Sequence, residues 1–274
     1  MPLFTMNRND TALKSMNART AARKTRRSSS FFWGGLLGWI LLWAIVALAM
    51  NNPVFFPGPV SVFRRFFELL GTPSFYSVLG ASTLRILTGF LIGQALGIGL
   101  AVPAARFSWL DDILTPPLLL LRSVPVASLV LFALFWFSGS TLSALLVIAI
   151  VLPIFYSSLL EGLHAVDPAL LEMGHVFRVP KTRLIRGIYF PQIFPYYRAA
   201  AEIAMGLAWK AGVAAEVIGQ VHGSVGVQLY QSKIYLELVD LAAWTLWILV
   251  SAHIWGMLNR ILLFRLKKRL ERFS

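Results

Sequence analysis

Long stretches without a charged side chain are the feature that most constrains the fold of this chain. Residues 31–50 contain no Asp, Glu, Lys or Arg, and residues 86–105 and 139–160 are equally free of charge. Residues 241–259 carry only a histidine. A helix of about 20 apolar residues is long enough to cross the hydrocarbon core of a bilayer. These four stretches therefore predict membrane-spanning helices.

Two further segments are apolar but interrupted by polar residues. Residues 113–137 contain Arg122 and three prolines, and residues 192–219 contain four charged side chains. We expect both to cross the membrane, the second as a polar fifth span. Because lipid offers no hydrogen-bond partner to the backbone, segments of this length must be helical. The sequence predicts an all-α integral membrane protein with six transmembrane helices.

The first apolar stretch also admits a second interpretation. A basic run precedes it, and Ala47-Leu48-Ala49 resembles the cleavage site of a secretory signal peptide. The apolar core of a signal peptide usually has 7–15 residues, which is shorter than residues 31–50. We therefore expect this segment to be retained as a membrane anchor.

The basic residues are distributed unevenly between the two sides of such a bundle. Eighteen of the 25 Lys and Arg residues lie in residues 1–30, at 106, in 178–186 and in 260–274, and three lie in the alternate connections. Cytoplasmic connections of membrane proteins are enriched in Lys and Arg. We expect both termini to be cytoplasmic. The net charge of +13 is thus a topology signal, and we expect no nucleic acid as a partner.

The sequence divides into three regions. Residues 1–30 are basic and rich in Ser, Thr, Asn and Ala, a composition typical of a disordered tail. Residues 31–262 form the expected transmembrane domain, which includes a long cytoplasmic connection at 163–190. Residues 263–274 form a second basic tail.

Two local patterns indicate how helices of this domain pack. Gly89, Gly93 and Gly97 recur at every fourth residue and form a smooth stripe that lets another helix approach closely. Residues 60–70 place aromatic and aliphatic side chains on one helical face and charged ones on the other. Such a helix either lies in the outer membrane interface or packs against the bundle.

The long cytoplasmic connection contains signals for two short helices. Asp167 is suited to an N-cap, with Pro168 at the first helical position. Pro180 interrupts the helix, and Pro191 predicts a boundary before the fifth span. Since such helices need something to cover their apolar side chains, we expect a partner protein on the cytoplasmic face.

This connection resembles the cytoplasmic motif of the permease subunits of ATP-binding-cassette importers. That motif reads Glu-Ala-Ala, three residues, Gly, nine residues and Ile-x-Leu-Pro. Glu172 matches its first position, and Ile188, Phe190 and Pro191 match its end. Met173 and Gly174 replace the two alanines, and Arg178 stands where the motif has Gly. Residues 82–105, 110–137, 167–172 and 206–219 also resemble the nitrate, sulfonate and taurine subfamily of these permeases.

The resemblance implies a type I importer fold in the cytoplasmic (inner) membrane of a bacterium. Two permease copies, expected as a homodimer, would form the pathway in the lipid bilayer. A cytoplasmic ATPase dimer would bind the helix around Glu172, and an extracytoplasmic binding protein would deliver a small anionic solute. Related permeases also suggest a thiamine-precursor pyrimidine or an aromatic compound as the solute.

The polar fifth span supplies the candidate pathway residues. Arg198 and Glu202 are four residues apart and are expected to pair, whereas Lys210 and Glu216 should find separate partners or water. Charges inside a span are costly and usually face a cavity or the bundle interior. Glu202, Lys210 and Glu216 therefore either contact solute or stabilise the bundle or the dimer contact. A cationic Lys210 suits an anionic solute.

Several chemistries are excluded by the sequence. The chain has no cysteine and no Gly-Lys pair, so it contains no phosphate-binding loop of the G-x-x-x-x-G-K-[ST] type. ATP and Mg²⁺ are therefore expected on the partner ATPase, with no cofactor, metal site or catalytic residue in this chain. A stand-alone secondary carrier remains an alternative, although such a carrier usually contains an internal repeat, and none is evident here.

Overall fold

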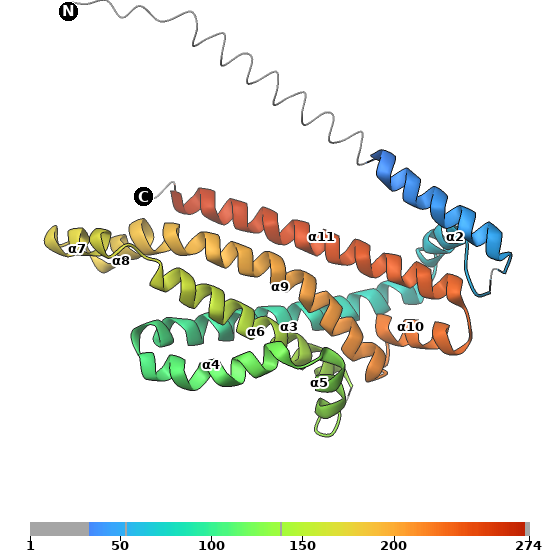
Figure 1. Cartoon of the computed structure of the whole chain (residues 1–274), viewed down its shortest axis with the longest axis horizontal. Helices are drawn as coiled ribbons and strands as arrows, with labels where there is room; N and C mark the ends of the chain where they lie inside the picture. The colour runs from blue at the N-terminus through green and yellow to red at the C-terminus, as the bar shows by residue number, and fades with distance from the viewer. Residues whose placement is uncertain (1–32, 53, 138, 272–274) are drawn as a thin grey trace, which may run out of the picture. The chain divides into compact units, whose positions relative to one another are not determined.

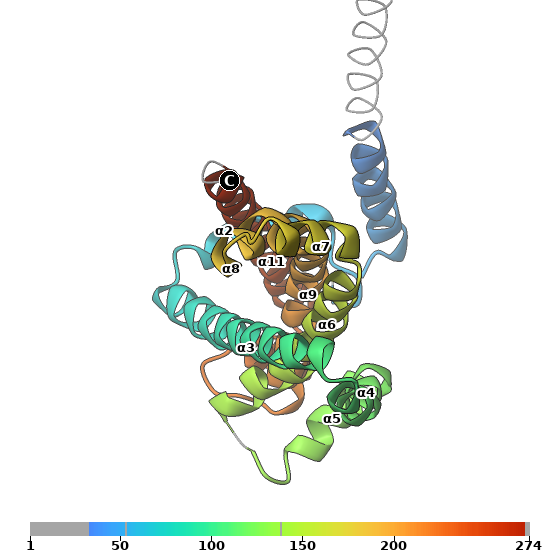
Figure 2. The same cartoon turned by 90° about the vertical axis from the view of Figure 1, so that its left-hand side faces the viewer.

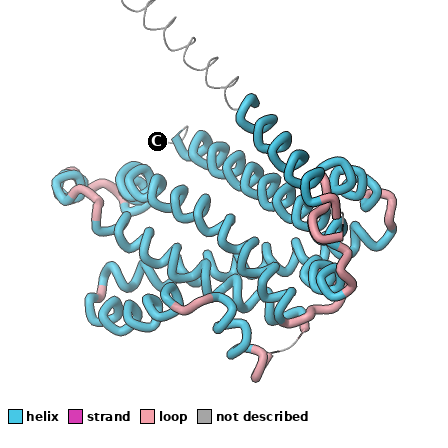
Figure 3. The backbone as a smooth tube through the Cα atoms, turned by 45° about the vertical axis from the view of Figure 1, so that its right-hand side comes forward, coloured by secondary structure: helices cyan, strands magenta, loops and turns pink. Residues whose placement is uncertain are grey.

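The computed structural model describes residues 33–52, 54–137 and 139–271, and every regular element in these ranges is a helix. Figure 3 shows helix and loop only. The predicted tail at residues 1–30 lies outside the described residues. The chain divides into two compact units, Met1–Phe63 and Arg64–Ser274, which are considered separately. In the first unit, the apolar helix Trp33–Met50 has the length of a membrane span.

The second unit is a bundle of long helices joined by short ones (Figure 1). Helix α2 (Pro59–Leu69) leads into it. The helices that follow are α3 (Pro73–Arg106), α4 (Ser108–Ser123), α5 (Val126–Ala133), α6 (Ser140–His164), α7 (Pro168–Val176), α8 (Lys181–Leu184), the π-helix η1 (Ile185–Tyr189), α9 (Phe190–Ile218), α10 (Val225–Ile234) and α11 (Leu238–Glu271).

The glycine stripe determines how the centre of the bundle packs. A Cβ atom added at Gly93 would lie 2.9 Å from the Cβ of Val151, and one at Gly97 would lie 2.7 Å from the Cβ of Phe155. The backbones of α3 and α6 can approach this closely only because these positions carry no side chain. Gly89 faces Val147 of α6 in the same way. The predicted packing role of the stripe is confirmed.

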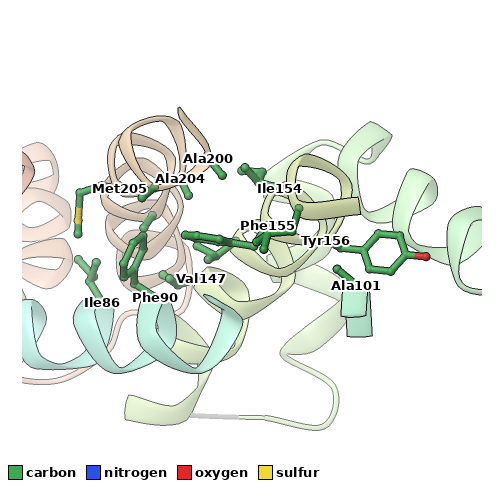
Figure 4. Packing of buried hydrophobic residues seen from close by; sticks show 14 of the residues in the cluster. Ile86, Phe90, Ala101, Val147, Ile154, Phe155, Tyr156, Ala200, Ala204 and Met205 are labelled. Carbon is green, nitrogen blue, oxygen red and sulfur yellow. The ribbon is translucent and has the colours of Figure 1, made fainter. Parts of the chain in front are cut away.

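The main core lies where α3, α6 and α9 meet. Figure 4 shows Phe90 of α3, Val147 and Phe155 of α6 and Ala204 of α9 directed toward one another. All four side chains are buried. Alanines of α9 let this helix lie close to its neighbours. Small side chains thus permit close packing both between α3 and α6 and between α6 and α9.

Helix α2 packs against the bundle through its second half. Arg65 donates two hydrogen bonds to the carboxylate of Asp240 in α11, at 2.6 and 2.8 Å. These bonds raise the pKa of the Arg65 guanidinium above its ordinary value. The ring of Phe66 stacks on Trp247 with a centroid distance of 4.2 Å. Packing against the bundle, one of the two interpretations left open by the sequence, describes this half of α2.

Among the residues that the structure describes, four helices are long and apolar enough to cross a membrane, and α4 with α5 would supply a fifth. Helix α9 has 29 residues but carries four charges, so six spans remain a prediction. The expected span at residues 113–137 is broken, because α4 and α5 meet at an angle of 104° (Figure 2). Pro125 follows the break, and a proline disfavours helical geometry in the residue before it.

The predicted boundary at Pro191 coincides with the start of α9, in whose first turn Pro191 lies, but the backbone stays helical across it. Residues 185–189 form a π-helix, and α9 continues through Pro191 without leaving helical geometry. Proline lacks a backbone N–H, and the wider turn of a π-helix accommodates that missing donor. Helices α8, η1 and α9 thus form one continuous helical path from the cytoplasmic connection into the bundle.

Candidate functional site: the α7–α8 hairpin and the charged face of α9

The hairpin Pro168–Leu184, which contains α7 and α8, is held in shape by both ends of α7. The carboxylate of Asp167 accepts a hydrogen bond from the backbone N–H of Ala169 at 2.9 Å, as an N-cap should. The backbone N–H of Asp167 donates to the side-chain oxygen of Gln192 in α9 at 3.0 Å. The predicted cap is confirmed, and it is tied directly to the start of α9.

The C-terminus of α7 ends in a Schellman motif centred on Arg178. The N–H of Arg178 donates to the carbonyl of His175 at 3.0 Å, and the N–H of Val179 donates to Gly174 at 2.9 Å. Arg178 has φ 52°, in the left-handed region where glycine is favoured. The backbone thus explains why a glycine suits this position of the motif, and Arg178 adopts the same conformation at a steric cost.

Gly174 permits the close contact between the two helices of the hairpin. A Cβ atom added there would lie 2.6 Å from the Cδ1 of Leu184 and 3.8 Å from the Cδ1 of Ile188. Gly174 is buried, and Leu184 and Ile188 are half-buried. Contacts of Gly174 with Leu184 and Ile188 therefore hold α7 against α8 and η1. Pro191 is exposed at the start of α9.

The outer face of α7 exposes apolar side chains at the basic end of the chain's second unit. Val176 and Phe177 are 78% and 74% exposed, and Met173 is 50% exposed. Glu172 is also exposed beside them. An apolar surface with a carboxylate at its edge is typical of a protein-binding surface. We call Glu172, Met173, Val176 and Phe177 the docking face.

The hairpin lies at the basic end of the bundle. In Figure 1, α7, α8, the Arg106 end of α3 and the C-terminal part of α11 lie at one end, and α10 lies at the other. The segments that the sequence predicts to be cytoplasmic therefore meet on one side of the second unit. This grouping agrees with the predicted orientation of this unit.

The charged residues of α9 separate into three environments. Arg198 donates to Glu202 at 2.9 Å, which confirms the predicted pair. The side chains of Arg198 and Glu202 are 55% and 39% exposed. Lys210 is exposed two turns farther along the helix. Glu216 is fully buried, so in this chain its carboxylate lies inside the bundle.

The buried carboxylate of Glu216 joins three helices. It accepts hydrogen bonds from Ser82 Oγ at 2.7 Å, from Arg85 Nε at 3.0 Å and from the backbone N–H of Gly226 at 3.3 Å. The hydroxyl of Ser82 also accepts from the N–H of Val225. Helices α3 and α9 are thereby fastened to the first turn of α10.

Ser82 and Arg85 were not among the predicted site residues. They are three residues apart on α3 and so share a helical face. Their spacing could have indicated that they act together. It does not indicate that Glu216, 131 residues later in the chain, is the partner of Arg85. Within the part of the chain that the structure describes, no group of three or more His, Asp or Glu residues could hold a metal ion.

Comparison with known proteins identifies the family. Residues 93–272 match the family of binding-protein-dependent transport system inner membrane components. The chain belongs to this family. Its matched region includes the docking face and the whole of α9. The chain is thus a non-catalytic membrane permease component of an ATP-binding-cassette importer, as the resemblance implied.

Two curated relatives and one solved structure illustrate the range of the family. A putative aliphatic sulfonates transport permease of Bacillus subtilis is 27% identical, covering 81% of this chain and 82% of that protein. A bicarbonate transport system permease of Synechococcus elongatus is 28% identical over 76% of this chain and 81% of that protein. An inward-facing methionine transporter, MetNI, shares the fold with a TM-score of 0.50 at 17% identity, covering 71% of this chain and 93% of the other.

Proposed function

We propose that this permease carries a small anionic solute through a pathway formed with a second permease copy, and that closure of a cytoplasmic ATPase dimer drives alternating access. An extracytoplasmic binding protein delivers the solute to the end of the bundle that bears α10. ATP and Mg²⁺ bind to the ATPase. The single observation that carries this proposal is the docking face, which exposes apolar side chains at the basic end of the bundle.

The structure of the hairpin supports its use as a coupling element. The docking face lies on α7, which is fixed to α9 through the bond between Asp167 and Gln192. Gly174 and Leu184 pack α7 onto α8, and α8 continues through η1 into α9. A displacement of the docking face is therefore transmitted to α9 through packed contacts and one continuous helical path.

The nature of the solute is supported by charge and by the relatives. Lys210 is an exposed cation on the face of α9 that also exposes Ile203 and Leu207. The two relatives described above are named for sulfonates and for bicarbonate, which are both anions. A sulfonate, taurine or nitrate is the solute class that these observations favour. The same observations give no support to an aromatic solute or a pyrimidine.

The first experiment purifies the assembly and tests whether the docking face holds the ATPase. The full chain is purified in mild detergent from its native membrane, and the accompanying chains and ATPase activity are measured. We expect an ATPase subunit in near-equal amount, and we expect Phe177→Ser to remove it. Phe107→Ser is the matched control, because Phe107 is also exposed at the basic end but lies outside the docking face. A stable oligomer without an ATPase would favour the secondary carrier instead.

Coupling and solute contact need separate variants. We expect Glu172→Lys to leave the assembly intact and to permit ATP hydrolysis without uptake. Lys210→Met should reduce uptake of anionic solutes, whereas Lys233→Met, which removes an exposed cation from α10, should not. Normal uptake by Lys210→Met with normal assembly would exclude a contact role for Lys210 and leave the docking result unaffected.

A further inference from the structure

Four cations from two helices converge on one cavity at the basic end of the bundle. Helix α9 contributes Arg198, and α11 contributes Arg260, Arg265 and Lys268. The cavity between them has a volume of about 750 Å³. A topology signal requires basic residues in a connection, but it does not require them to line a common cavity. Their convergence therefore needs another explanation.

The same cavity has apolar walls. Met257, Ile261 and Phe264 of α11 line it beside the cations, and all three belong to a helix that qualifies as a membrane span. A soluble anion needs only the cations. A cavity lined by both cations and apolar side chains matches an amphiphile.

A second cavity extends the first one along the same two helices. It has a volume of about 300 Å³ and shares His253 and Arg260 with the first. Gly206 of α9 and Gly256 of α11 line it, and a Cβ atom at either position would meet no other atom within 4 Å. The two glycines thus leave an open gap between α9 and α11.

One carboxylate, Glu202, faces this second cavity. Its charge is offset by the hydrogen bond from Arg198. The two cavities together, which we call the α9–α11 groove, therefore present an excess of positive charge at the basic end and small residues farther along.

We propose that the α9–α11 groove binds one anionic phospholipid of the cytoplasmic leaflet. The phosphate lies among Arg198, Arg260, Arg265 and Lys268, and one acyl chain lies along Gly206 and Gly256. This site is separate from the docking face and does not depend on the identity of the solute. The lipid fills a groove between the helix that follows the hairpin and the last helix of the chain.

The test measures lipid binding to the full chain. The protein is purified with its accompanying subunits, stripped of lipid and titrated with phosphatidylglycerol or phosphatidylcholine, and bound lipid is counted by native mass spectrometry. We expect preference for phosphatidylglycerol. The double variant Arg260→Gln with Arg265→Gln should lower that affinity by about 30-fold at low ionic strength, since each basic residue near a membrane surface contributes a factor of about 5 to 6. Gly256→Leu, which fills the gap between α9 and α11, should also lower it.

Matched controls separate the site from general charge and size effects. Arg183→Gln with Arg186→Gln removes two exposed cations at the same end of the bundle, and Gly99→Leu adds the same side chain to an open position of α3. Neither should change the affinity. An equal loss in the arginine control would show diffuse electrostatic binding and overturn the proposal.

Two further outcomes would also overturn it. Competition by inorganic phosphate, with no effect of Gly256→Leu, would identify a site for a soluble anion. Loss of the second permease copy in Gly256→Leu, with unchanged lipid binding, would identify the groove as an interface between copies.

Discussion

Arg178 occupies a backbone conformation that suits glycine better than any residue with a side chain. Its φ of 52° places it in the left-handed region, which costs an L-residue roughly 1–2 kcal/mol. Both hydrogen bonds of the Schellman motif are made by backbone atoms, so they do not depend on the arginine side chain. We expect Arg178→Gly to stabilise the hairpin locally by about 1 kcal/mol.

Hydrogen exchange of the amides at residues 174–179 measures this effect, because it reports local opening. Arg183→Gly is the control, since Arg183 lies in right-handed helical geometry in α8, where glycine is unfavourable by about 1 kcal/mol. The two substitutions should change protection in opposite directions. Equal loss of protection in both variants would contradict the role assigned to the left-handed backbone.

The buried network of Glu216 makes a second prediction at the residue scale. Removing the charge of a buried carboxylate leaves the guanidinium of Arg85 without its partner, and breaking a buried pair typically costs about 3–5 kcal/mol. Arg85 keeps some solvent exposure, so we expect Glu216→Gln to destabilise the protein by about 2–3 kcal/mol. The measurement is thermal unfolding in detergent.

Glu202→Gln is the matched variant, because it is the same substitution on the same helix. The Arg198–Glu202 pair is exposed and four residues apart, and such pairs contribute about 0.3–0.5 kcal/mol. We therefore expect little change in its thermal stability. If Glu216→Gln were as stable as Glu202→Gln, the network would not fasten α10 to α3 and α9.

At the scale of elements, the contact between α3 and α6 depends on the glycine stripe. Gly93→Ala places a Cβ atom 2.9 Å from the Cβ of Val151, and overpacking of this kind costs about 1–3 kcal/mol. Gly99→Ala adds the same methyl group to an open face of the same helix, where alanine is favoured by up to about 1 kcal/mol. Thermal unfolding should show a lower unfolding temperature for Gly93→Ala and a higher one for Gly99→Ala. An unchanged unfolding temperature in Gly93→Ala would indicate that α3 and α6 can move apart freely.

Local patterns predicted the elements whose geometry depends on neighbours in the sequence. The cap at Asp167 and the glycine stripe of α3 both follow from residue type and spacing, and the structure confirms both. The break between α4 and α5 was missed, as was the π-helix that continues helical geometry into α9. A proline permits either a break or a continued helix, and the packing of neighbouring helices decides between them.

The partner of Glu216 was missed for a different reason. A charged residue inside a span predicts a partner, but the identity of that partner depends on which helices meet. Arg85 lies 131 residues away from Glu216 along the chain, and α10 contributes the N–H of Gly226. No pattern within a single helix contains this information. The buried network is therefore a property of the bundle and not of α9.

At the scale of the whole molecule, the distribution of basic residues and the arrangement of the helices distinguish the same two ends of the second unit. The hairpin, the Arg106 end of α3 and the basic part of α11 meet at one end of the second unit, and α10 lies at the other (Figure 1). A coupling surface must face the cytoplasm, where ATP is available, and a delivery surface must face the opposite side. The docking face and the α9–α11 groove both belong to the end that we assign to the cytoplasm.

This polarity can be measured directly because the chain contains no cysteine. Single cysteines are introduced by Arg186→Cys at the basic end and by Lys233→Cys in α10, both at exposed positions. In right-side-out membrane vesicles, a membrane-impermeant maleimide should label the variant in α10 and should label Arg186→Cys only after the vesicles are opened. The unsubstituted chain is the control for background labelling. Labelling of Arg186→Cys in sealed vesicles would contradict the assigned orientation. The docking face would then lie outside the cytoplasm, with no access to a cytoplasmic ATPase.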